Sequence, residues 1–331
     1  FFHLYVNGLY WGLYNAVERP NADFGSSYYG GDKDGWDALN SYPRNVVDGT
    51  ADHWLQAHAI ANAGVADQTG YDALSQYVDI PNLIDYMLVN FYGGNLDWDD
   101  HNWYSINPRV GGGGYKFVCW DAERTLENVG GDNRTGVGQA DKPSRLYSQL
   151  RANPEFLLQF ADRAHKHLFN GGALTPARTV PRFLDLSTYI DRAIVGESAR
   201  WGDSKRANPY TRDVEWVTER DRLLGNYLPQ RTDVTLNQLR SASLYPNTDA
   251  PVFSQHGGHV ASTTELTMSN TSGTIYYTID GSDPRLPGGN INPTALQYDG
   301  SVSSSTLVPE GSTWKYLDNG SNQGTSWRAP S

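Results

Sequence analysis

Residues 95–102 read NLDWDDHN, and this polar stretch decides how the chain is interpreted. It follows an apolar segment of helical periodicity and precedes Trp103-Tyr104-Ser105-Ile106, which is typical of a strand. A second strand-like run, Tyr115 to Trp120, ends at Asp121. The pattern predicts a helix, a polar loop and a two-stranded hairpin, which would bring residues 95–102 and Asp121 together.

The helix before this loop carries the clearest periodicity in the chain. Its apolar residues recur at helical spacing and would pack inward: Leu83, Ile84, Met87, Leu88 and Phe91. Pro81 suits a first turn, and Gly93-Gly94 supplies the stop. Pro108 and Gly111–Gly114 would form the turn between the two strands that follow.

Three side chains of this region suggest chemistry. Asp97 and Asn102 have the spacing D-x-x-x-x-N, and Asp121 lies just past the end of the hairpin. In kinase-like phosphoryl transfer, one aspartate orients the attacking hydroxyl. An asparagine five residues later and an aspartate after the next hairpin hold the metal ions that bridge the phosphates. Carboxylate and amide oxygens are hard ligands that suit Mg²⁺ or Mn²⁺.

A plainer interpretation is a polar loop that caps a helix and a hairpin. Asp99 and Asp100 are expected to be solvated, or to support the ligands from behind. Glu123 is either a ligand or the partner of Arg124 or another basic residue. Cys119, on an apolar strand, is expected to be a buried small hydrophobe.

The rest of the first 240 residues predicts a mixture of strands and helices. Asn7-Gly8 between two runs of β-formers predicts a hairpin that begins as a buried strand, with Gly12 marking a bulge. Residues 20–53 are expected to be rich in loops. Helices are then expected at 54–63 and 71–77, and they should dominate from about 143 to 240. One of these starts at Asn153-Pro154-Glu155 and stops at Asn170-Gly171-Gly172, and others cover 181–201, 211–226 and 233–240.

The character of the chain changes near Tyr245-Pro246. From Pro251 onward it is rich in Ser, Thr, Gly and β-formers, and several short strands with turns between them suggest a small β-sandwich over 250–306. After Leu307 the pattern indicates the start of another unit, and about 25 residues cannot complete a domain. We therefore expect a truncated C-terminus, and a start at Phe1 that lies inside a longer protein.

Composition excludes several classes of protein. The 331 residues have a formal net charge of −11, which argues against a nucleic-acid binder because such a protein needs a basic face. No apolar run approaches the roughly 18 residues of a membrane span. A single cysteine excludes an intrachain disulfide and a cysteine-based zinc site.

The chain resembles the CotH kinase family, the spore coat protein H-like atypical relatives of the protein kinase fold. The resemblance covers roughly residues 1–240 and rests on three motifs. They are VNGLYWGLY at 6–14 with Glu18, NLD through NWY at 95–104, and KFVCWD at 116–121. It implies a secreted or cell-surface protein, of bacterial origin, that transfers phosphoryl groups from ATP.

The resemblance also implies roles for single residues. Asp97 matches the catalytic-loop aspartate of the family, whereas Asn102 and Asp121 match its metal-binding residues, so that Mg²⁺ (or Mn²⁺) and ATP are the expected cofactors. Glu18 could bind a nucleotide or substrate group, or form a structural ion pair. The phosphate-binding lysine is not identifiable in this chain, and Lys33 is a candidate without support from its spacing.

Residues 273–285, GTIYYTIDGSDPR, resemble the small β-sandwich at the C-terminus of chitobiase and β-hexosaminidase-type enzymes. The end of the chain, from Val308, resembles the start of a galactose-binding-like jelly roll. The expected fold class is thus α+β, an atypical protein-kinase-like domain over 1–240 with its N-terminal part truncated. A small Ig-like β-sandwich over 250–306 and the start of a truncated jelly-roll-like domain over 307–331 follow.

Three functions compete at this point. The favoured one is a secreted CotH-like kinase that transfers phosphoryl, or AMP, to a hydroxyl of a protein or glycan acceptor. A glycan hydrolase would instead use two carboxylates among Asp97, Asp121 and Glu123, at a separation of about 5–5.5 Å or about 6.5–9.5 Å. A catalytically inactive surface scaffold or glycan-binding protein is the third.

Overall fold

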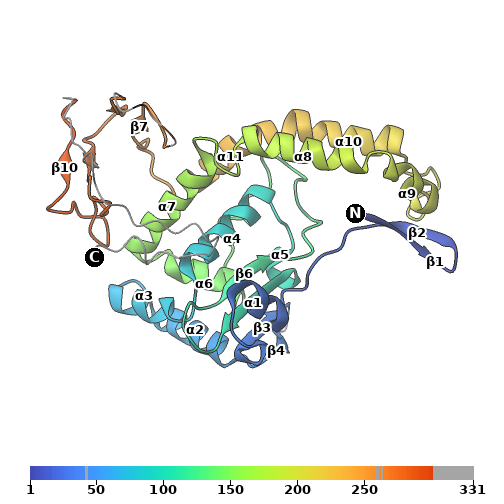
Figure 1. Ribbon diagram of the computed structural model, residues 1–331, viewed down its shortest axis with the longest axis horizontal. Helices are drawn as coiled ribbons and strands as arrows, with labels where there is room; N and C mark the ends of the chain where they lie inside the picture. Colours follow the sequence, from blue (N-terminus) through green and yellow to red (C-terminus); the bar gives the residue numbers. More distant parts are fainter. Residues whose placement is uncertain (42–43, 258, 260, 262–263, 301–331) are drawn as a thin grey trace. The chain divides into compact units, whose positions relative to one another are not determined.

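The computed structural model describes residues 1–41, 44–257, 259, 261 and 264–300 (Figure 1). The chain divides into two compact units. The first comprises Phe1–Asp249 with Arg285–Asn290, and the second comprises Ala250–Pro284 with the residues from Ile291 onward. The first unit contains all of the long helices and the candidate site.

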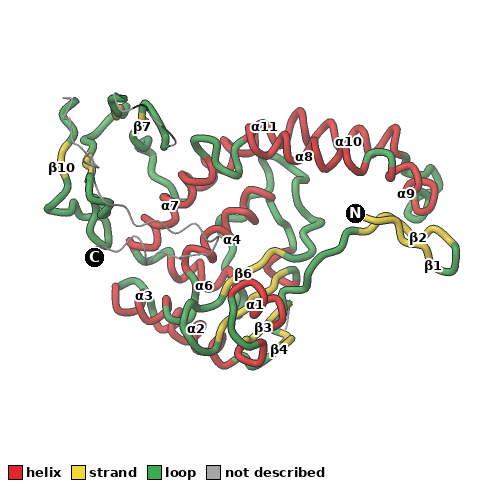
Figure 2. Tube along the Cα trace, in the orientation of Figure 1, coloured by secondary structure: helices red, strands yellow, loops and turns green. Residues whose placement is uncertain are grey.

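The first unit contains a four-stranded antiparallel sheet (Figure 2). Its strand order is β4-β3-β5-β6. The strands are β3 (Trp36–Asn40), β4 (Asn45–Asp48), β5 (Trp103–Pro108) and β6 (Lys116–Cys119). The predicted hairpin of residues 103–120 is confirmed, because Trp103 pairs with Cys119 and Ile106 pairs with Lys116. Pro108, expected in the turn, instead ends β5 opposite Trp36.

The two faces of the sheet are covered by different elements. Alternate side chains of a strand point to opposite faces. Trp103 and Leu39 accordingly join the main core, where the Trp103 ring stacks on Trp54 at 5.1 Å. Ala38 and Ile106 face the other way and pack in a small cluster with Ala22 of α1 (Ala22–Tyr29).

The main core is built around α4 (Ile80–Gly93), the helix expected near Pro81. Its predicted stop is confirmed, because Gly94 takes the left-handed conformation (φ 60°) that closes the helix. Helix α4 packs against β6 and three other helices. The helices that complete the core are α2 (Asp52–Ala63), α3 (Gln68–Ser75), α6 (Pro143–Leu150), α7 (Pro154–Leu168) and α11 (Leu228–Ser241).

Residues 20–53 contain more regular structure than expected. Helix α1, the short η1 turn (Lys33–Gly35) and strands β3 and β4 all fall in this region. The expectation of a loop was wrong because its glycines suggested breaks, whereas pairing with β5 on one side and β4 on the other holds β3 in place. β3, WDALN, carries no β-branched residue that could have signalled a strand.

The N-terminal hairpin forms as predicted from Asn7-Gly8. Strands β1 (Phe2–Val6) and β2 (Leu9–Tyr14) pair, and the register shifts beside Gly12, where the bulge was expected. The expectation of a buried strand was wrong, because four of the five β1 residues are exposed. The hairpin contacts α9 (Ala193–Trp201), a helix far away in sequence.

The later helices follow the expectation with shifted boundaries. Helix α8 (Pro176–Ile190) contains Pro181 in its first turns instead of starting there. The two helices expected at 211–226 and 233–240 form one continuous helical segment. It consists of η2 (Arg212–Trp216), α10 (Val217–Arg222), η3 (Leu223–Tyr227) and α11. Helix α8 lies alongside α11 (Figure 1).

The second unit shows two short strand pairs among its described residues. β7 (Val252–Phe253) pairs with β8 (Met268–Ser269), and β9 (Tyr276–Tyr277) pairs with β10 (Leu296–Gln297). These pairs do not confirm the expected Ig-like sandwich. The jelly-roll start expected over 307–331 lies outside the described residues. No helix within the described ranges is both long and apolar enough to cross a membrane.

Candidate functional site

The end of α4 sets the direction of the polar loop. After Gly94 the Asn95 amide donates to the Asn90 carbonyl at 3.0 Å, and the Asn95 side chain donates to Asn90 Oδ1 at 3.0 Å. Both asparagines are buried. This closed end fixes where the chain leaves the helix, two residues before Asp97.

Asp97 precedes a single helical turn, α5 (Trp98–His101). Its Oδ1 is buried and accepts no hydrogen bond, and no other carboxylate oxygen in the described part of the chain is in that condition. A buried polar atom without a partner costs about 1–3 kcal/mol, and a charged one costs more. A hydroxyl donor or a cation at this oxygen would therefore stabilise the loop.

The β5–β6 hairpin brings Asn102 and Asp121 to the same end of the sheet. Because Trp103 pairs with Cys119, Asn102 lies just before the pair and Asp121 just two residues after it. Asn102 is buried, whereas Asp121 is exposed. Asp121 has a φ of 47°, a left-handed conformation that aspartate tolerates better than most residues.

Two backbone hydrogen bonds join the polar loop to the segment after β6. The Leu96 amide donates to the Arg124 carbonyl at 3.0 Å, and the Leu126 amide donates to the Gly93 carbonyl at 2.8 Å. The loop that carries Asp97 and the turn that follows Asp121 thus lie side by side. Nothing in the sequence signalled these two bonds, which hold the loop independently of the hairpin.

Asp99 is buried, so it is not the solvated residue that was one of the two expectations. It is only 1% exposed, and its carboxylate accepts hydrogen bonds from both the hydroxyl and the amide of Ser144. Helix α6 begins after Lys142, whose side chain does not cap the helix. Asp99 caps it instead, by accepting from the Ser144 amide in the first turn. Burial nevertheless raises the pKa of Asp99 to about 6.

Lys142 completes this connection. It is 2% exposed, and its ammonium group donates to the Asp100 carbonyl at 2.8 Å and lies 3.6 Å from the Asp100 carboxylate. Burial lowers the pKa of Lys142. We call Asp99, Lys142 and Ser144 the loop clamp, because together they fasten α5 to the start of α6. Of the two expectations for Asp99, its burial excludes a solvated side chain, whereas a role in supporting the ligands from behind stays a prediction.

Within the described ranges, Glu18 forms no hydrogen bond or ion pair with Asp97, Asn102 or Asp121. It is exposed and accepts a hydrogen bond from Tyr28. Its neighbour Arg19 is more suggestive, because the Arg19 Nε donates to the Tyr104 hydroxyl at 3.1 Å. The Tyr104 ring packs edge-on against Trp120, the residue before Asp121, at 4.9 Å. Sequence reasoning missed Arg19, whose only signal was its position beside Glu18.

The other charged candidates take partners of their own. Arg124 pairs with Glu127 at 2.6 Å, so Glu123 is not its ion-pair partner there. Lys33 is exposed, lies 3.7 Å from Asp23, and lines a separate cavity of about 360 Å³ that none of the predicted site residues lines.

Cys119 is exposed, which corrects the expectation that it is buried. It lies at the end of β6, where the Asn90 side chain donates to its sulfur at 3.6 Å.

The donor set fits a nucleotide-bound magnesium ion better than an ion held by protein alone. Within the described ranges, no three His, Cys, Asp or Glu side chains gather closely enough to bind a metal. Mg²⁺ needs only one or two carboxylates when phosphates and water supply the other ligands. Asp121 and the amide oxygen of Asn102, two residues that the hairpin brings to the same end of the sheet, are a set of that kind.

Comparison with known proteins identifies the family of the chain. A search among curated proteins found no match. The family model described as "CotH kinase protein" matches residues 1–233, more than two thirds of the chain and all of the elements that build the site. The chain belongs to the CotH kinase protein family.

Proposed function

We propose that this protein transfers the γ-phosphoryl group of Mg·ATP to a hydroxyl group, with Asp97, Asn102 and Asp121 as its central residues. Membership of the CotH family suggests an atypical kinase-like function and, with it, ATP and a divalent metal. The residue roles below are our proposal.

One observation carries the proposal, namely the unpartnered buried oxygen of Asp97. A carboxylate that only caps a helix would be satisfied by backbone amides, as Asp67 is in α3. The Asp97 side chain does not cap α5. Asp97 Oδ1 has no hydrogen-bond donor, although backbone hydrogen bonds and the loop clamp hold the surrounding loop in place. Such an oxygen is expected in a residue whose hydrogen-bond donor comes from the substrate.

Each residue of the site would then do one task. Asp97 would accept a hydrogen bond from the acceptor hydroxyl, orient its oxygen toward the phosphorus and receive its proton. Asn102 and Asp121 would hold Mg²⁺, which neutralises charge on the phosphates. Arg19, which donates a hydrogen bond to Tyr104, would offer a cation to a phosphate oxygen.

The test uses two forms of radioactive ATP, labelled at the γ- or at the α-phosphate, and follows label incorporated into the protein itself and into casein. Transfer of the γ-label alone is expected. We expect Asp97→Asn to lower the rate at least about 100-fold, because it removes the base, while Mg·ATP binding stays within about twofold. Asp121→Ala should weaken binding itself.

Asp203→Ala is the matched control, since Asp203 is an exposed aspartate of another turn. Transfer of the α-label would show that AMP is the transferred group. No transfer of either label, with no Mg·ATP binding, would contradict the proposal and favour a scaffold. Glycan hydrolysis that needs no nucleotide would instead favour the carboxylate-pair alternative.

Further details belong to the same proposal. The acceptor would be a protein or a glycan, and the protein would act outside the cell or at its surface, as the family resemblance implies. The resemblance of residues 273–285 to the chitobiase-type module supports a spacer or glycan-associated role for the second unit.

A further inference from the structure

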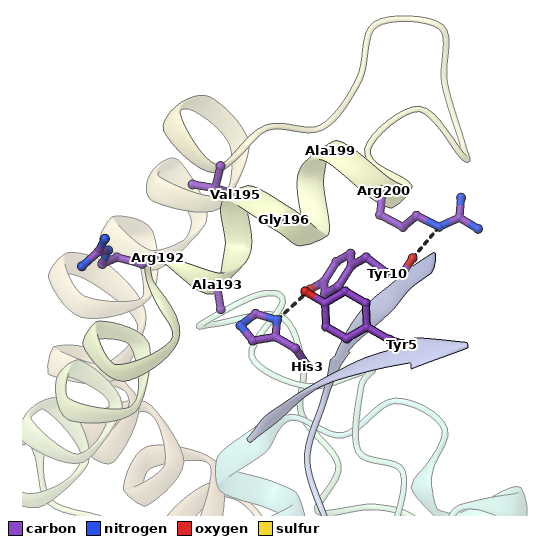
Figure 3. Close-up of a pocket in the computed structure, with 9 residues that line it drawn as sticks. All are labelled: His3, Tyr5, Tyr10, Arg192, Ala193, Val195, Gly196, Ala199 and Arg200. Carbon is purple, nitrogen blue, oxygen red and sulfur yellow. Dashed lines mark hydrogen bonds between the residues drawn. The ribbon is translucent and has the colours of Figure 1, made fainter. Parts of the chain in front are cut away.

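A groove of about 660 Å³ lies between the N-terminal hairpin and α9 (Figure 3). The hairpin contributes three rings to it, those of His3, Tyr5 and Tyr10. The helical side is mostly small and apolar, with an arginine toward each end; it consists of Arg192, Ala193, Val195, Gly196, Ala199 and Arg200. We call this the hairpin groove. Its volume falls in the usual range for ligand sites, about 300–1,000 Å³.

The two walls of the hairpin groove are fastened to each other. Glu197 accepts a hydrogen bond from the Leu13 amide at 2.7 Å, and the Trp201 indole donates to the Trp11 carbonyl at 2.6 Å. The Arg200 Nε donates to the Tyr10 carbonyl at 3.0 Å. These bonds join side chains of α9 to the backbone of β2, so the groove exists before any ligand arrives.

The hairpin groove is rich in hydrogen-bond donors. Arg200 is held in place over the Trp201 ring at 4.0 Å, and Arg192 is exposed. Neither guanidinium forms an ion pair with any residue that the structure describes. No carboxylate or carboxamide side chain lines the groove. Glu197 serves the hairpin instead. This local positive charge stands out in a chain with a net charge of −11.

We propose that the hairpin groove binds an acidic peptide segment of a partner protein. Carboxylates accept hydrogen bonds from arginine in a bidentate geometry, which suits the two arginines. A neutral sugar fits less well, because its hydroxyls must also donate and the groove lacks carboxylate and amide acceptors. Long nucleic acid would be repelled by the net negative charge.

The small residues in the middle of α9 define the centre of the proposed ligand. A Cβ on Gly196 would lie 3.5 Å from the Tyr10 ring, so the ring rests directly on the helix backbone there. The Tyr5 ring is 61% exposed and packs edge-on against Tyr10. An apolar side chain of the peptide would pack against these rings and against Ala193 and Ala199.

The spacing of the arginines sets the spacing of the acidic residues. Arg192 and Arg200 are eight positions apart, or about 12 Å along a helix. Their side chains extend outward in opposite directions (Figure 3). An extended peptide advances about 3.3 Å per residue, so its two acidic residues should lie at least four positions apart. This binding does not depend on the proposed nucleotide reaction.

Fluorescence anisotropy with a labelled peptide tests the proposal on the full chain. The probe carries two glutamates six positions apart around a central phenylalanine, and a matched probe carries glutamines instead. We expect saturable binding of the glutamate probe that weakens with added salt, and at least fivefold weaker binding of the glutamine probe. Arg192→Gln should weaken the glutamate probe about two- to fivefold, as removal of an exposed charge pair does.

Two further variants keep the test independent of folding. Arg182→Gln, at an exposed arginine of α8, is the matched control and should bind as the unchanged protein does. Arg192→Glu should prefer a probe in which lysine replaces the facing glutamate. Equal binding of the glutamate and glutamine probes, or no binding of either, would overturn the proposal. Binding of heparin that needs Arg192, without peptide binding, would also overturn it and assign the groove to an anionic glycan.

Discussion

Asp99 is a buried carboxylate, and its two hydrogen bonds to Ser144 do not offset the cost of its burial. Its pKa is raised to about 6 in the folded protein, against about 3.9 in an unfolded chain. Between these values the folded state holds a proton that the unfolded state has lost. The Asp99 contribution to stability is therefore present below about pH 4 and is lost as the pH rises through about 6.

Asp99→Asn should remove this pH dependence. We compare the free energy of unfolding of the unchanged protein with that of Asp99→Asn. The difference should shift against the unchanged protein by about 2–3 kcal/mol between pH 4 and pH 7. Urea denaturation at several pH values measures the difference. A difference that stays constant over this range would show that Asp99 does not titrate there.

His58 changes the stability of the protein in the opposite direction to Asp99, over nearly the same pH range. Burial against the Trp54 ring lowers its pKa to about 4, from about 6.5 in an unfolded chain. Between these values the unfolded chain binds a proton that the folded protein does not. The stability that depends on His58 is therefore present above about pH 6.5 and is lost as the pH falls toward 4.

His58→Gln should remove this loss on acidification, which amounts to about 3 kcal/mol between pH 6.5 and pH 4. The same denaturation series tests it. Because the two groups oppose each other, the unchanged protein should show a shallower pH profile than either single variant. A steeper profile than both would contradict this account.

At the scale of elements, the end of α4 is held by an arginine from another helix. Arg231 of α11 is fully buried and donates to carbonyl groups on both sides of the candidate site: those of Phe91, Tyr92, Val129 and Asp132. The last carbonyls of a helix have no partner within it. Arg231 donates hydrogen bonds to two of these carbonyls, those of Phe91 and Tyr92, which lie a few residues before Asp97.

Arg231→Met should destabilise the protein by at least about 3 kcal/mol. The Val129 and Asp132 carbonyls would lose the Arg231 donor, and the Phe91 and Tyr92 carbonyls would keep only the Gly94 amide and the Tyr227 hydroxyl. Urea denaturation measures the loss. Arg182→Met, at an exposed arginine on α8, is the control and should change stability by less than about 0.5 kcal/mol. Equal stability of the two variants would mean that water replaces the Arg231 guanidinium.

The turn between β4 and α2 depends on a close approach at Gly49. Its φ is +70°, and a Cβ there would lie 2.2 Å from an Asp37 carboxylate oxygen. That fully buried oxygen accepts from the Thr50 amide at 2.8 Å. Asp37 thereby fastens the turn to β3.

Gly49→Ala should cost at least about 2 kcal/mol, since it combines a left-handed backbone with a clash. Gly111→Ala separates the two effects, because Gly111 also has a positive φ (+95°) but open space around its Cβ position. Thermal denaturation should show a clearly larger loss for Gly49→Ala. Equal losses would mean that the clash relaxes freely.

At the scale of the whole molecule, the sequence predicted those elements whose signals are local. Helix α4 has a continuous apolar stripe and a glycine stop, and the Asn7-Gly8 turn defines its own hairpin. Strand β3 was missed because only its pairing with β4 and β5, which are distant in sequence from one another, makes it a strand. The break expected between residues 226 and 233 does not occur, because the helix continues through Gly225 in η3 and Pro229 in the first turn of α11.

The candidate site divides in the same way. The proximity of the 95–102 loop and the segment after β6 followed from a hairpin that the sequence signals. The loop clamp, Arg19 and Arg231 could not be predicted, because each reaches the site from an element far away in sequence. The sequence also does not show which aspartate of the polar loop is buried, because Asp97, Asp99 and Asp100 all lie in the same polar stretch.

The central claim is that Asn102 and Asp121 hold the metal of a nucleotide. Calorimetric titration of Mg·ATP into the full chain tests it most directly, with Asp121→Ala as the test variant and Asp203→Ala as the control. We predict saturable binding that requires Mg²⁺, is retained in Asp203→Ala and falls at least tenfold in Asp121→Ala. Binding that is equally strong in Asp121→Ala, or no binding to the unchanged protein, would contradict the account.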